Sequence, residues 1–202
     1  MEARDAILQS VRRAIAAAPK EPTEVPRGYR ERTVSGDLVE LFAERVEDYR
    51  AVVTRAAAAD VEEAIRAALA GAERVVVPDG LEYDVPGTVA GAVDMAAAEL
   101  DHLDAVVTGA SIGIAITGTI VLEHGPGQGR RALSLVPDLH VCIVREEQVV
   151  AGVPEAVARL DPERPQTWIS GPSATSDIEL NRVEGVHGPR NLHVILVGRP
   201  TG

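Results

Sequence analysis

The chain has 202 residues, of which 46% are hydrophobic, and this is enough apolar material for one domain with a sizeable core. The formal net charge of −11 argues against a nucleic-acid-binding surface, because neutralising phosphates requires clustered Lys and Arg in excess. No hydrophobic stretch reaches the length of a membrane span, and the N-terminus lacks the apolar core of a signal peptide, so we expect a cytoplasmic protein.

The first residues predict an amphipathic helix over residues 2–17. Apolar positions recur there at helical spacing with charged residues between them: Ala3, Ile7, Leu8, Val11, Ala14 and Ile15. The stretch that follows is rich in Pro and charge and lacks periodicity, which is typical of a tether. We therefore divide the chain into residues 1–36, the helix and its Pro-rich linker, and residues 37–202, a compact domain.

The domain begins with alternating helix and strand patterns. We expect helices over 37–49 and 60–72, strands over 50–56 and 73–80, a further helix beginning near residue 86, and a strand ending at residue 110. Strands that alternate with helices are typical of a mostly parallel sheet. We therefore predict an α/β fold with a mostly parallel central sheet and helices on both of its faces.

Two longer apolar runs follow, and we interpret both as central strands. They span residues 114–123 and 139–146, with a short helix over 130–136 between them. The rest of the pattern predicts a helix over 153–160 and strands over 166–170 and 191–197.

Two reactive residue types occur only once, and this limits the chemistry. Cys142 is the only cysteine, so the chain by itself can hold neither an intrachain disulfide nor a cysteine-ligated iron–sulfur cluster. It lies in the apolar run LHVCIV, and we interpret it as a small core residue. Lys20 is the only lysine and lies in the Pro-rich linker, so we set Schiff-base catalysis aside. We expect no bound cofactor.

Residues 117–131, TGTIVLEHGPGQGRR, contain a glycine-rich turn. Glycines leave backbone amides uncrowded, and paired arginines follow where a helix could start, a combination suited to binding an anion. The candidate ligand-binding residues here are Thr117, Gly118, Thr119, Gly125, Gly127, Gly129, Arg130 and Arg131. The spacing matches neither a P-loop nor a dinucleotide fingerprint, and a flexible connection with two solvated arginines explains it equally well. Glu123, beside the turn, is a candidate catalytic carboxylate.

Residues 168–180, WISGPSATSDIEL, indicate a strand, a turn and the start of a helix. A Gly-Pro pair stops the strand, and residues that favour the first positions of a helix follow. Ser173, Thr175 and Ser176 could donate hydrogen bonds to a carboxylate or phosphate at this helix N-terminus. Asp177 could instead cap the same N–H groups, or act as a base or nucleophile if the site is catalytic.

A third turn-rich segment, RVEGVHGPRNLHV at residues 182–194, precedes the last strand. Loops at the ends of parallel strands are where open α/β sheets bind ligands. His187 could transfer a proton near neutral pH and Arg190 could pair with a carboxylate, although a His between glycines is also typical of a surface turn. Glu184 and His187 lack a further ligand at metal-binding spacing, so we expect no metal site. The histidines in or beside strand patterns are interpreted as structural: His124, His140 and His193.

Three runs, AITGTIVLEHGPGQGRRALSLVPDLHVCIV, WISGPSATSDIE and VEGVHGPRNLHVILV, resemble in this order the LUD domain family of bacterial lactate utilization proteins. The resemblance covers roughly the last half of the chain closely. It implies an α/β fold of the type shared by ribose-phosphate isomerases, glucosamine-phosphate deaminases and CoA transferases. It also implies a role in oxidising L-lactate to pyruvate, alongside partner proteins that carry iron–sulfur clusters. The resemblance assigns no catalytic residue, because those of the related enzymes do not map cleanly onto this sequence.

Three hypotheses on function follow. In the first, the chain is a subunit or accessory factor without clusters that binds a small carboxylate or phosphorylated compound; Arg130, Arg131 and Arg190 pair with the anion, and Glu123 or His187 moves a proton. In the second, the chain is an independent enzyme of the isomerase or acyl-transfer kind. In the third, it is a structural or regulatory subunit whose N-terminal helix docks on a partner.

Overall fold

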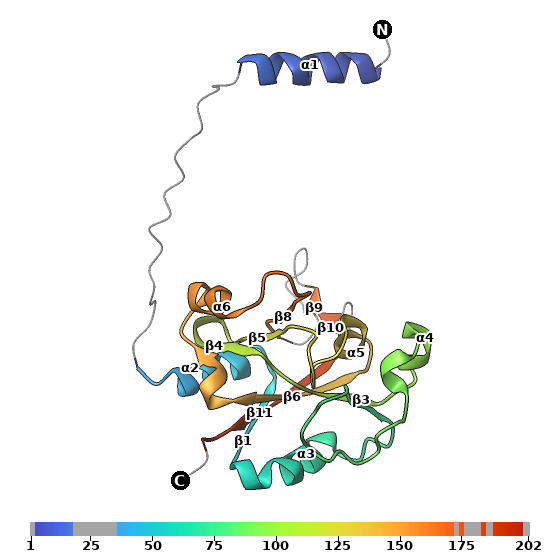
Figure 1. Ribbon diagram of the computed structural model, residues 1–202, viewed down its shortest axis with the longest axis vertical. Coiled ribbons are helices and arrows are strands. Elements are labelled where there is room, and N and C mark those ends of the chain that lie inside the picture. The colour runs from blue at the N-terminus through green and yellow to red at the C-terminus, as the bar shows by residue number, and fades with distance from the viewer. Residues whose placement is uncertain (1–2, 18–35, 172–173, 176–182, 185–187, 200–202) are drawn as a thin grey trace.

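The computed structural model describes residues 3–17, 36–171, 174–175, 183–184 and 188–199. Within these ranges the domain is built in layers (Figure 1). One helix covers a parallel sheet, a second sheet packs on the other face of the parallel sheet, and another helix covers the outer face of the second sheet. The layers bring the carboxyl ends of the parallel strands together at one edge, and this edge positions the candidate site.

The first sheet contains five parallel strands in the order β1, β11, β6, β3, β2. Their bounds are β1 (Val52–Ala56), β2 (Val75–Val76), β3 (Ala105–Gly109), β6 (Leu139–Arg145) and β11 (Asn191–Val197). β6 lies at the centre, and its residues from His140 to Val144 are all buried. A parallel strand covered on both faces is apolar at successive positions, which is why LHVCIV shows no alternation.

Helix α3 (Val61–Leu69) covers one face of the parallel sheet. Val61, Ile65 and Leu69 recur at helical spacing and are buried against the sheet, where Val107 and Ile195 belong to the same apolar cluster. This stripe determines which side of the helix faces the strands.

The opposite face packs on a second, mixed sheet in the order β7, β4, β5, β8. Its strands are β4 (Ile112–Ile114), β5 (Thr119–Leu122), β7 (Val149–Val150) and β8 (Thr167–Ile169). β5 is antiparallel to both of its neighbours, whereas β4 and β7 are parallel. Helix α6 (Val153–Arg159) covers the outer face, where Ala156 and Leu160 are buried with Ile114 and Val121.

Helix α2 (Leu38–Asp48) connects the two sheets. Its Phe42 is fully buried in a cluster that draws residues from both of them. Gly113 on β4 leaves room for the ring, since a Cβ there would lie 3.1 Å from Phe42 Cε2. At Gly118, where φ is 62°, a Cβ would lie 2.8 Å from the backbone carbonyl carbon of Arg45. Glycine at both positions therefore allows α2 to approach the second sheet closely.

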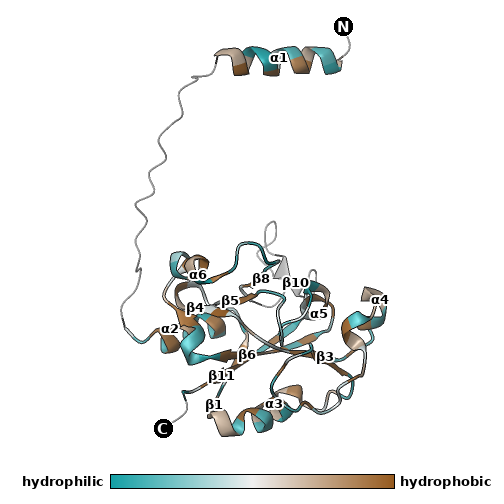
Figure 2. Ribbon diagram, viewed as in Figure 1, coloured by the Kyte–Doolittle hydropathy of each residue, from teal (hydrophilic) through white to brown (hydrophobic). Residues whose placement is uncertain are grey.

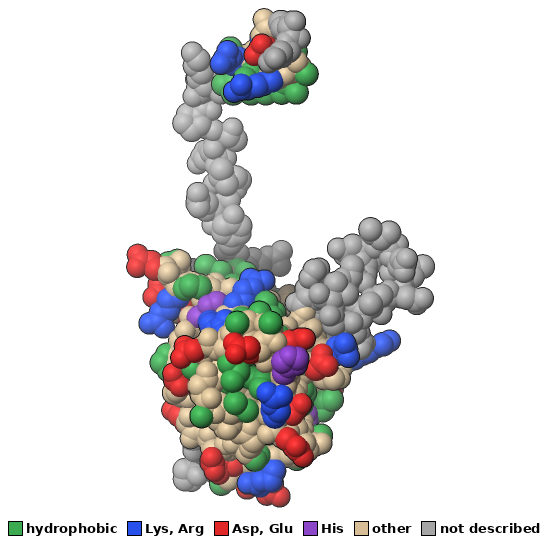
Figure 3. Space-filling view, turned by 90° about the vertical axis from the view of Figure 1, so that its right-hand side faces the viewer, with side chains coloured by type: hydrophobic (Ala, Val, Ile, Leu, Met, Phe, Trp, Pro, Cys, Tyr) green, Lys and Arg blue, Asp and Glu red, His purple; other side chains and the backbone are tan. Residues whose placement is uncertain are grey.

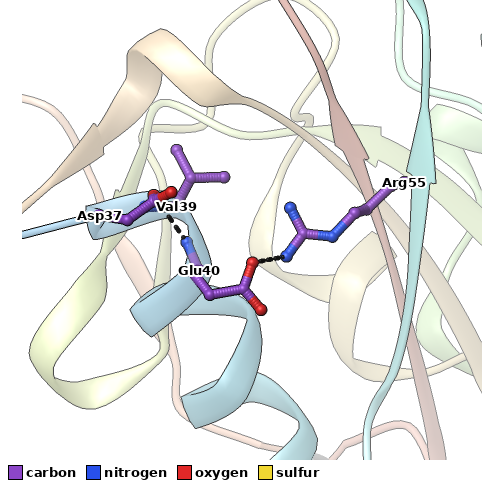
Figure 4. Close-up of polar contacts among 4 residues, drawn as sticks. All are labelled: Asp37, Val39, Glu40 and Arg55. Carbon is purple, nitrogen blue, oxygen red and sulfur yellow. Dashed lines mark hydrogen bonds and ion pairs between the residues drawn. The ribbon is translucent and has the colours of Figure 1, made fainter.

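Two polar contacts hold the first turn of α2 (Figure 4). The Asp37 side chain accepts hydrogen bonds from the backbone N–H groups of Val39 and Glu40, at 3.0 and 3.1 Å, as a helix N-cap does. The Glu40 carboxylate pairs with the Arg55 guanidinium of β1 at 2.5 Å. Both side chains of this pair are about half exposed, so its net contribution to stability is small.

The remaining described elements are short: α4 (Ala97–Leu100), α5 (Arg131–Leu135), β9 (Ala174–Thr175) and β10 (Val183–Glu184). β9 and β10 pair antiparallel. Leu100 and Leu133, from α4 and α5, are buried against Val76 and Val106 at the β2 side of the parallel sheet.

The predicted central strand over residues 114–123 is wrong in two respects. The run is divided into the end of β4, a short 3-10 turn at Ala115–Thr117 and β5. These strands, together with the predicted strand at 166–170, belong to the second sheet. The second sheet is itself covered on both faces, so its strands are as apolar as those of a central parallel strand and the pattern cannot tell the two apart.

The helix predicted from residue 86 is also much shorter than expected. The structure shows a 3-10 turn at Ala92–Asp94 and the single-turn helix α4. Gly87 and Gly91 have φ of 74° and 73°, in the left-handed region that ends helices. The alanine-rich composition of this segment favoured a longer helix than these glycines allow.

Helix α1 (Ala3–Ala17) confirms the predicted N-terminal helix, and apolar and polar bands alternate along it (Figure 2). None of its residues is buried, so no other described residue covers its apolar stripe. In the part of the chain that the structure describes, no helix combines the length and apolar content needed to cross a bilayer.

Replacing Phe42 by Ala is expected to lower the free energy of unfolding by about 3–5 kcal/mol, because it leaves a cavity between the two sheets. Urea unfolding followed by circular dichroism measures the change. Val52→Ala is the control: Val52 is 55% exposed on an edge strand, and we expect a change of about 0.5 kcal/mol or less. Equal effects of the two substitutions would contradict the role given to α2.

Candidate functional site

A cavity of about 200 Å³ lies at the carboxyl ends of β3 and β6. Its walls come from the loop after β2, the ends of the two strands and the glycine-rich turn: residues 80–83, 109–110, 126–128, Ile143, Arg145 and Gln148. Open α/β sheets bind ligands beyond the carboxyl ends of their strands. This cavity is therefore the candidate site.

Backbone hydrogen bonds join the glycine-rich turn to the loops beside it. Gly127 donates its N–H to the Asp79 carbonyl and accepts from the Gly109 N–H, both at 2.7 Å. At Gly80, where φ is 83°, a Cβ would lie 2.7 Å from Pro126 Cβ. Only a glycine at position 80 allows the two loops to approach this closely.

Arg145 is the cation that lines the cavity. Its guanidinium forms an ion pair with Glu82, and the two side chains are 39% and 70% exposed. Partial burial acts to lower the pKa of Arg145, but its interactions with Tyr83 and Glu82 outweigh this and raise the pKa. The Gln148 side chain accepts from the backbone N–H of Arg145 at 2.8 Å and donates to the Ala110 carbonyl at 2.6 Å. The site thus contains the positive charge of Arg145 and the side-chain amide of Gln148, which two hydrogen bonds hold in place.

The glycine-rich turn does not offer its amides to a ligand in the way the sequence suggests. The N–H groups of Gln128 and Gly129 donate to the Gly125 carbonyl at 3.0 and 3.2 Å, and that of Gly127 is bonded to Asp79. These donors are satisfied within the protein. The turn forms a wall of the cavity, and its glycines serve close packing.

Arg130 has structural partners. Its side chain donates hydrogen bonds to the backbone carbonyls of Val93, at 2.9 Å, and Met95. These contacts attach the start of α5 to the segment before α4, and the pairing of Arg130 with an anion stays a prediction.

Glu123 and Arg131 lie near His124, outside the cavity lining. The Glu123 carboxylate accepts the backbone N–H of Asp161 at 2.8 Å, so it holds the turn after α6. Arg131 is exposed, and partial burial together with the charge of Arg131 lowers the pKa of His124. The ring of His124 hydrogen-bonds to Thr167 at 2.8 Å.

The Thr-Gly-Thr run lies against the end of α2 and beside β8. Thr117 and Thr119 share a hydrogen bond at 2.7 Å, and Thr119 is also 2.7 Å from the Ser170 hydroxyl. The Gly118 carbonyl accepts the Tyr49 hydroxyl at 2.6 Å. The structure thus brings this run next to Ser170, at the start of the Ser/Thr-rich segment, as a binding site shared by the two motifs would require. Neither threonine lines the cavity, however.

Arg190 lies at the opposite edge of the parallel sheet. It precedes β11 as Asp138 precedes β6, and the two residues form an exposed ion pair at 3.5 Å. Residues that precede parallel strands lie at the amino edge, whereas the cavity lies at the carboxyl edge. Arg190 therefore lies apart from the cavity, and its pairing with an anion stays a prediction.

The Ser/Thr-rich segment is only partly described. Thr175 belongs to β9 and not to the helix start predicted for it. Ser173, Ser176, Asp177 and His187 lie outside the described residues, and their roles stay predictions.

Sequence reasoning missed the polar residues of the cavity. Arg145 and Gln148 follow the central apolar run in the stretch VREEQ, and Glu82 and Tyr83 follow the strand at 75–76. Open α/β sheets bind ligands beyond the carboxyl ends of their parallel strands. This rule could have identified these residues, because they follow strands, whereas Arg190 precedes β11.

His140, Thr108 and Cys142 form a buried polar cluster inside the parallel sheet. Thr108 Oγ1 lies 2.8 Å from His140 Nε2 and 3.7 Å from Cys142 Sγ. Burial lowers the pKa of His140 to about 4 and raises that of the Cys142 thiol to about 12, so both are neutral at pH 7. Cys142 is thus a core residue, as predicted. His193 has a similar partner, with Nε2 2.8 Å from Thr54 Oγ1.

Two surface properties bear on ligand class. Within the described ranges, no three His, Cys, Asp or Glu side chains are arranged to hold a metal ion. On the face shown in Figure 3, acidic and basic side chains are interspersed.

The model of the LUD domain matches residues 2–197. The chain belongs to the LUD domain family. This LUD domain protein is 46% identical to lactate utilization protein C of Deinococcus radiodurans, over 98% of this chain and 96% of that protein. It is 40% identical to lactate utilization protein C of Bacillus pumilus, over 42% of this chain and 38% of that protein.

A crystal structure of a DUF162 family protein from Deinococcus radiodurans, at 1.70 Å resolution, is also similar. The TM-score is 0.68 at 43% sequence identity, covering 80% of this chain and 96% of that one. The family resemblance inferred from the sequence motifs is confirmed. The finer likeness to isomerases and CoA transferases stays a prediction.

The buried His140 is expected to make stability depend on pH. Its pKa is about 4 in the folded chain and about 6.5 when unfolded, so the unfolded state binds more protons between these values. The free energy of unfolding should therefore fall as the pH is lowered from about 7 to about 4, by up to about 3 kcal/mol. Urea unfolding at a series of pH values measures this.

His140→Asn should make that pH dependence shallower, even if it lowers stability at every pH. His102→Asn is the matched control, because His102 is exposed, and it should leave the slope unchanged. His124 and His193 have pKa values lowered by burial and contribute in the same direction, so a residual slope is expected. An unaltered slope in His140→Asn would count against a buried neutral histidine.

Proposed function

We propose that this LUD domain protein is the component without iron–sulfur clusters of a bacterial L-lactate utilization system, and that it binds a small carboxylate. The observation that carries the proposal is the similarity to lactate utilization protein C over nearly the whole chain. Cys142, the only cysteine, is fully buried, so any clusters needed for lactate oxidation would belong to partner proteins.

Arg145 is the residue we propose to bind the carboxylate. It already holds a carboxylate, that of Glu82, in an ion pair whose side chains are 39% and 70% exposed. Exposed pairs contribute little to stability, so a ligand can displace Glu82 at small cost. The guanidinium can then donate two hydrogen bonds to the ligand carboxylate in a bidentate arrangement, which is stronger and more directional than a contact with one nitrogen.

The size and walls of the cavity suit a short acid. Its volume of about 200 Å³ is below the range of roughly 300–1,000 Å³ typical of pockets for drug-sized ligands. Tyr83 and Gln148 also line the cavity, and their polar side chains could contact the hydroxyl of lactate or the keto oxygen of pyruvate. We propose both acids as ligands, since they differ only at this carbon.

The remaining predicted residues enter the proposal as candidates. Ser173, Thr175 and Ser176 would donate further hydrogen bonds to the anion, and Asp177 or His187 would move a proton. The fold type of the isomerases and CoA transferases is kept as part of the same proposal, because those proteins also handle small anionic substrates.

Thermal unfolding with and without ligand tests the binding site. L-lactate or pyruvate at about one hundred times its Kd should stabilise the chain by roughly 2.7 kcal/mol and raise Tm. Arg145→Gln should remove the shift. Glu82→Gln should enlarge it at the same ligand concentration, because the competing carboxylate is gone.

Arg55→Gln is the matched control, since Arg55 also forms an exposed pair with a glutamate but does not line the cavity (Figure 4). It should keep the full shift. A shift that survives Arg145→Gln would move the ligand elsewhere, and no shift with either acid would refute carboxylate binding.

Growth on L-lactate tests the biological role. In a Deinococcus radiodurans strain that lacks its own lactate utilization protein C, expression of this chain should restore growth on L-lactate and leave growth on a sugar unchanged. Arg145→Gln, expressed to the same level, should restore it less well. No rescue by an equally abundant wild-type chain would argue against the lactate role, whatever the binding experiment gives.

A further inference from the structure

A groove of about 400 Å³ lies beside α6, where the chain leads from α6 to β8. Three of its five lining residues are apolar, Val157, Leu160 and Pro162, and the other two are Arg164 and Gln166. It is separate from the cavity at the carboxyl edge of the parallel sheet and shares no residue with it.

Exposed hydrophobic side chains extend this groove on both sides. Val153 precedes Val157 by one helical turn of α6, and the two are 42% and 58% exposed. Trp168 of β8 is 40% exposed, and its Nε1 donates to Gln166 in the groove at 3.0 Å. Trp168 pairs with Val121, so it lies on the sheet face that α6 covers. Contiguous apolar surface of this kind marks an interaction site.

Helix α1 is a second uncovered apolar surface. Its stripe consists of Ile7, Leu8, Val11 and Ile15, which are 63%, 39%, 47% and 69% exposed. Basic side chains stand next to this stripe (Figure 3). A helix of 15 residues is marginally stable in water by propensity alone, so packing of its apolar face is what would stabilise it.

We propose that α1 of one copy of this chain docks in the α6–β8 groove of a second copy, and that reciprocal exchange forms a two-fold symmetric dimer. Every residue of α1 is exposed in the single chain, so the described part of its own domain does not cover the stripe. The helix and the rest of the chain carry opposite net charges: α1 has three arginines and one aspartate, a net charge of +2, which leaves −13 on the rest of a chain whose total is −11. Beside the groove, Asp161 pairs with Arg164 at 3.3 Å, and Glu163 lies between two lining residues in the sequence.

The connection is long enough for this exchange. Eighteen residues separate α1 from residue 36, and a chain of that length spans up to about 60 Å. A domain of this size has a radius of gyration of about 15 Å, so this span exceeds the width of one domain and can reach a groove on the adjoining side of a neighbouring copy. Two identical helix–groove contacts then hold the dimer, as two-fold symmetry requires.

Cysteine cross-linking in the full chain tests which copy α1 contacts. The natural Cys142 is buried, so cysteines introduced at exposed positions are the reactive ones. Val11→Cys and Val157→Cys chains, mixed and mildly oxidised, should give a disulfide-linked pair of chains. Val11→Cys mixed with Val52→Cys should give far less, because Val52 is as exposed as Val157, 55% against 58%, but lies outside the groove.

A link that forms only inside a chain carrying both cysteines, and not between the two singly substituted chains, would overturn the proposal by showing that α1 covers its own groove. Absence of any link at Val157 would overturn it as well.

Light scattering over a range of concentrations gives an independent measurement. The wild-type chain should be a dimer, and Val157→Glu should dissociate to monomers by placing a charge in the groove. Val52→Glu should remain dimeric, and circular dichroism should show that both variants keep the wild-type fold. A wild-type monomer at every concentration, or a Val157→Glu chain that stays dimeric, would refute the exchange. Neither result bears on the carboxylate site, which is argued from other residues.

Discussion

Burial of β6 on both faces is the constraint on which the other layers depend. Val141 and Ile143 face the side covered by α3, whereas Cys142 and Val144 face α2 and the second sheet. A strand in this position has no solvent face, so each polar group it carries must be neutral or paired. Arg145 is the first residue toward the carboxyl end of β6 that is partly exposed to solvent. A charged side chain is tolerated at this position, which is why the cation of the candidate site lies there.

The candidate site follows from strand direction and close loop contact. Parallel strands bring their carboxyl ends to one edge, and Gly80 and Gly127 let the loops after β2 and β5 meet above that edge. The result is a small cavity lined by one arginine, which forms an ion pair with Glu82. This chemistry agrees with the proposed lactate role, which rests on the similarity to lactate utilization protein C.

Two apolar surfaces remain uncovered when the domain is complete, the stripe of α1 and the groove between α6 and β8. The same sequence pattern that produces an amphipathic helix in the core, as in α3, produces α1, whose apolar stripe is covered by no other described residue. An amphipathic pattern thus indicates that a helix packs on an apolar surface, but it does not identify that surface. The acidic character of the rest of the chain favours a basic helix such as α1 as the missing cover.

The sequence by itself determined where most helices and strands lie, since periodicity records how many faces of an element are buried, and its motifs identified the LUD domain family. It did not determine which sheet the apolar runs join, because β5 and β6 are both buried and look alike. Nor did it separate Arg190 from Arg145: both flank strands, and only the parallel pairing puts one at the amino edge and the other at the carboxyl edge. The partners of Arg130 and Glu123 are backbone groups from distant segments, which no local pattern encodes. Tertiary structure decided these points because they depend on strand direction and on contacts between residues far apart in the chain.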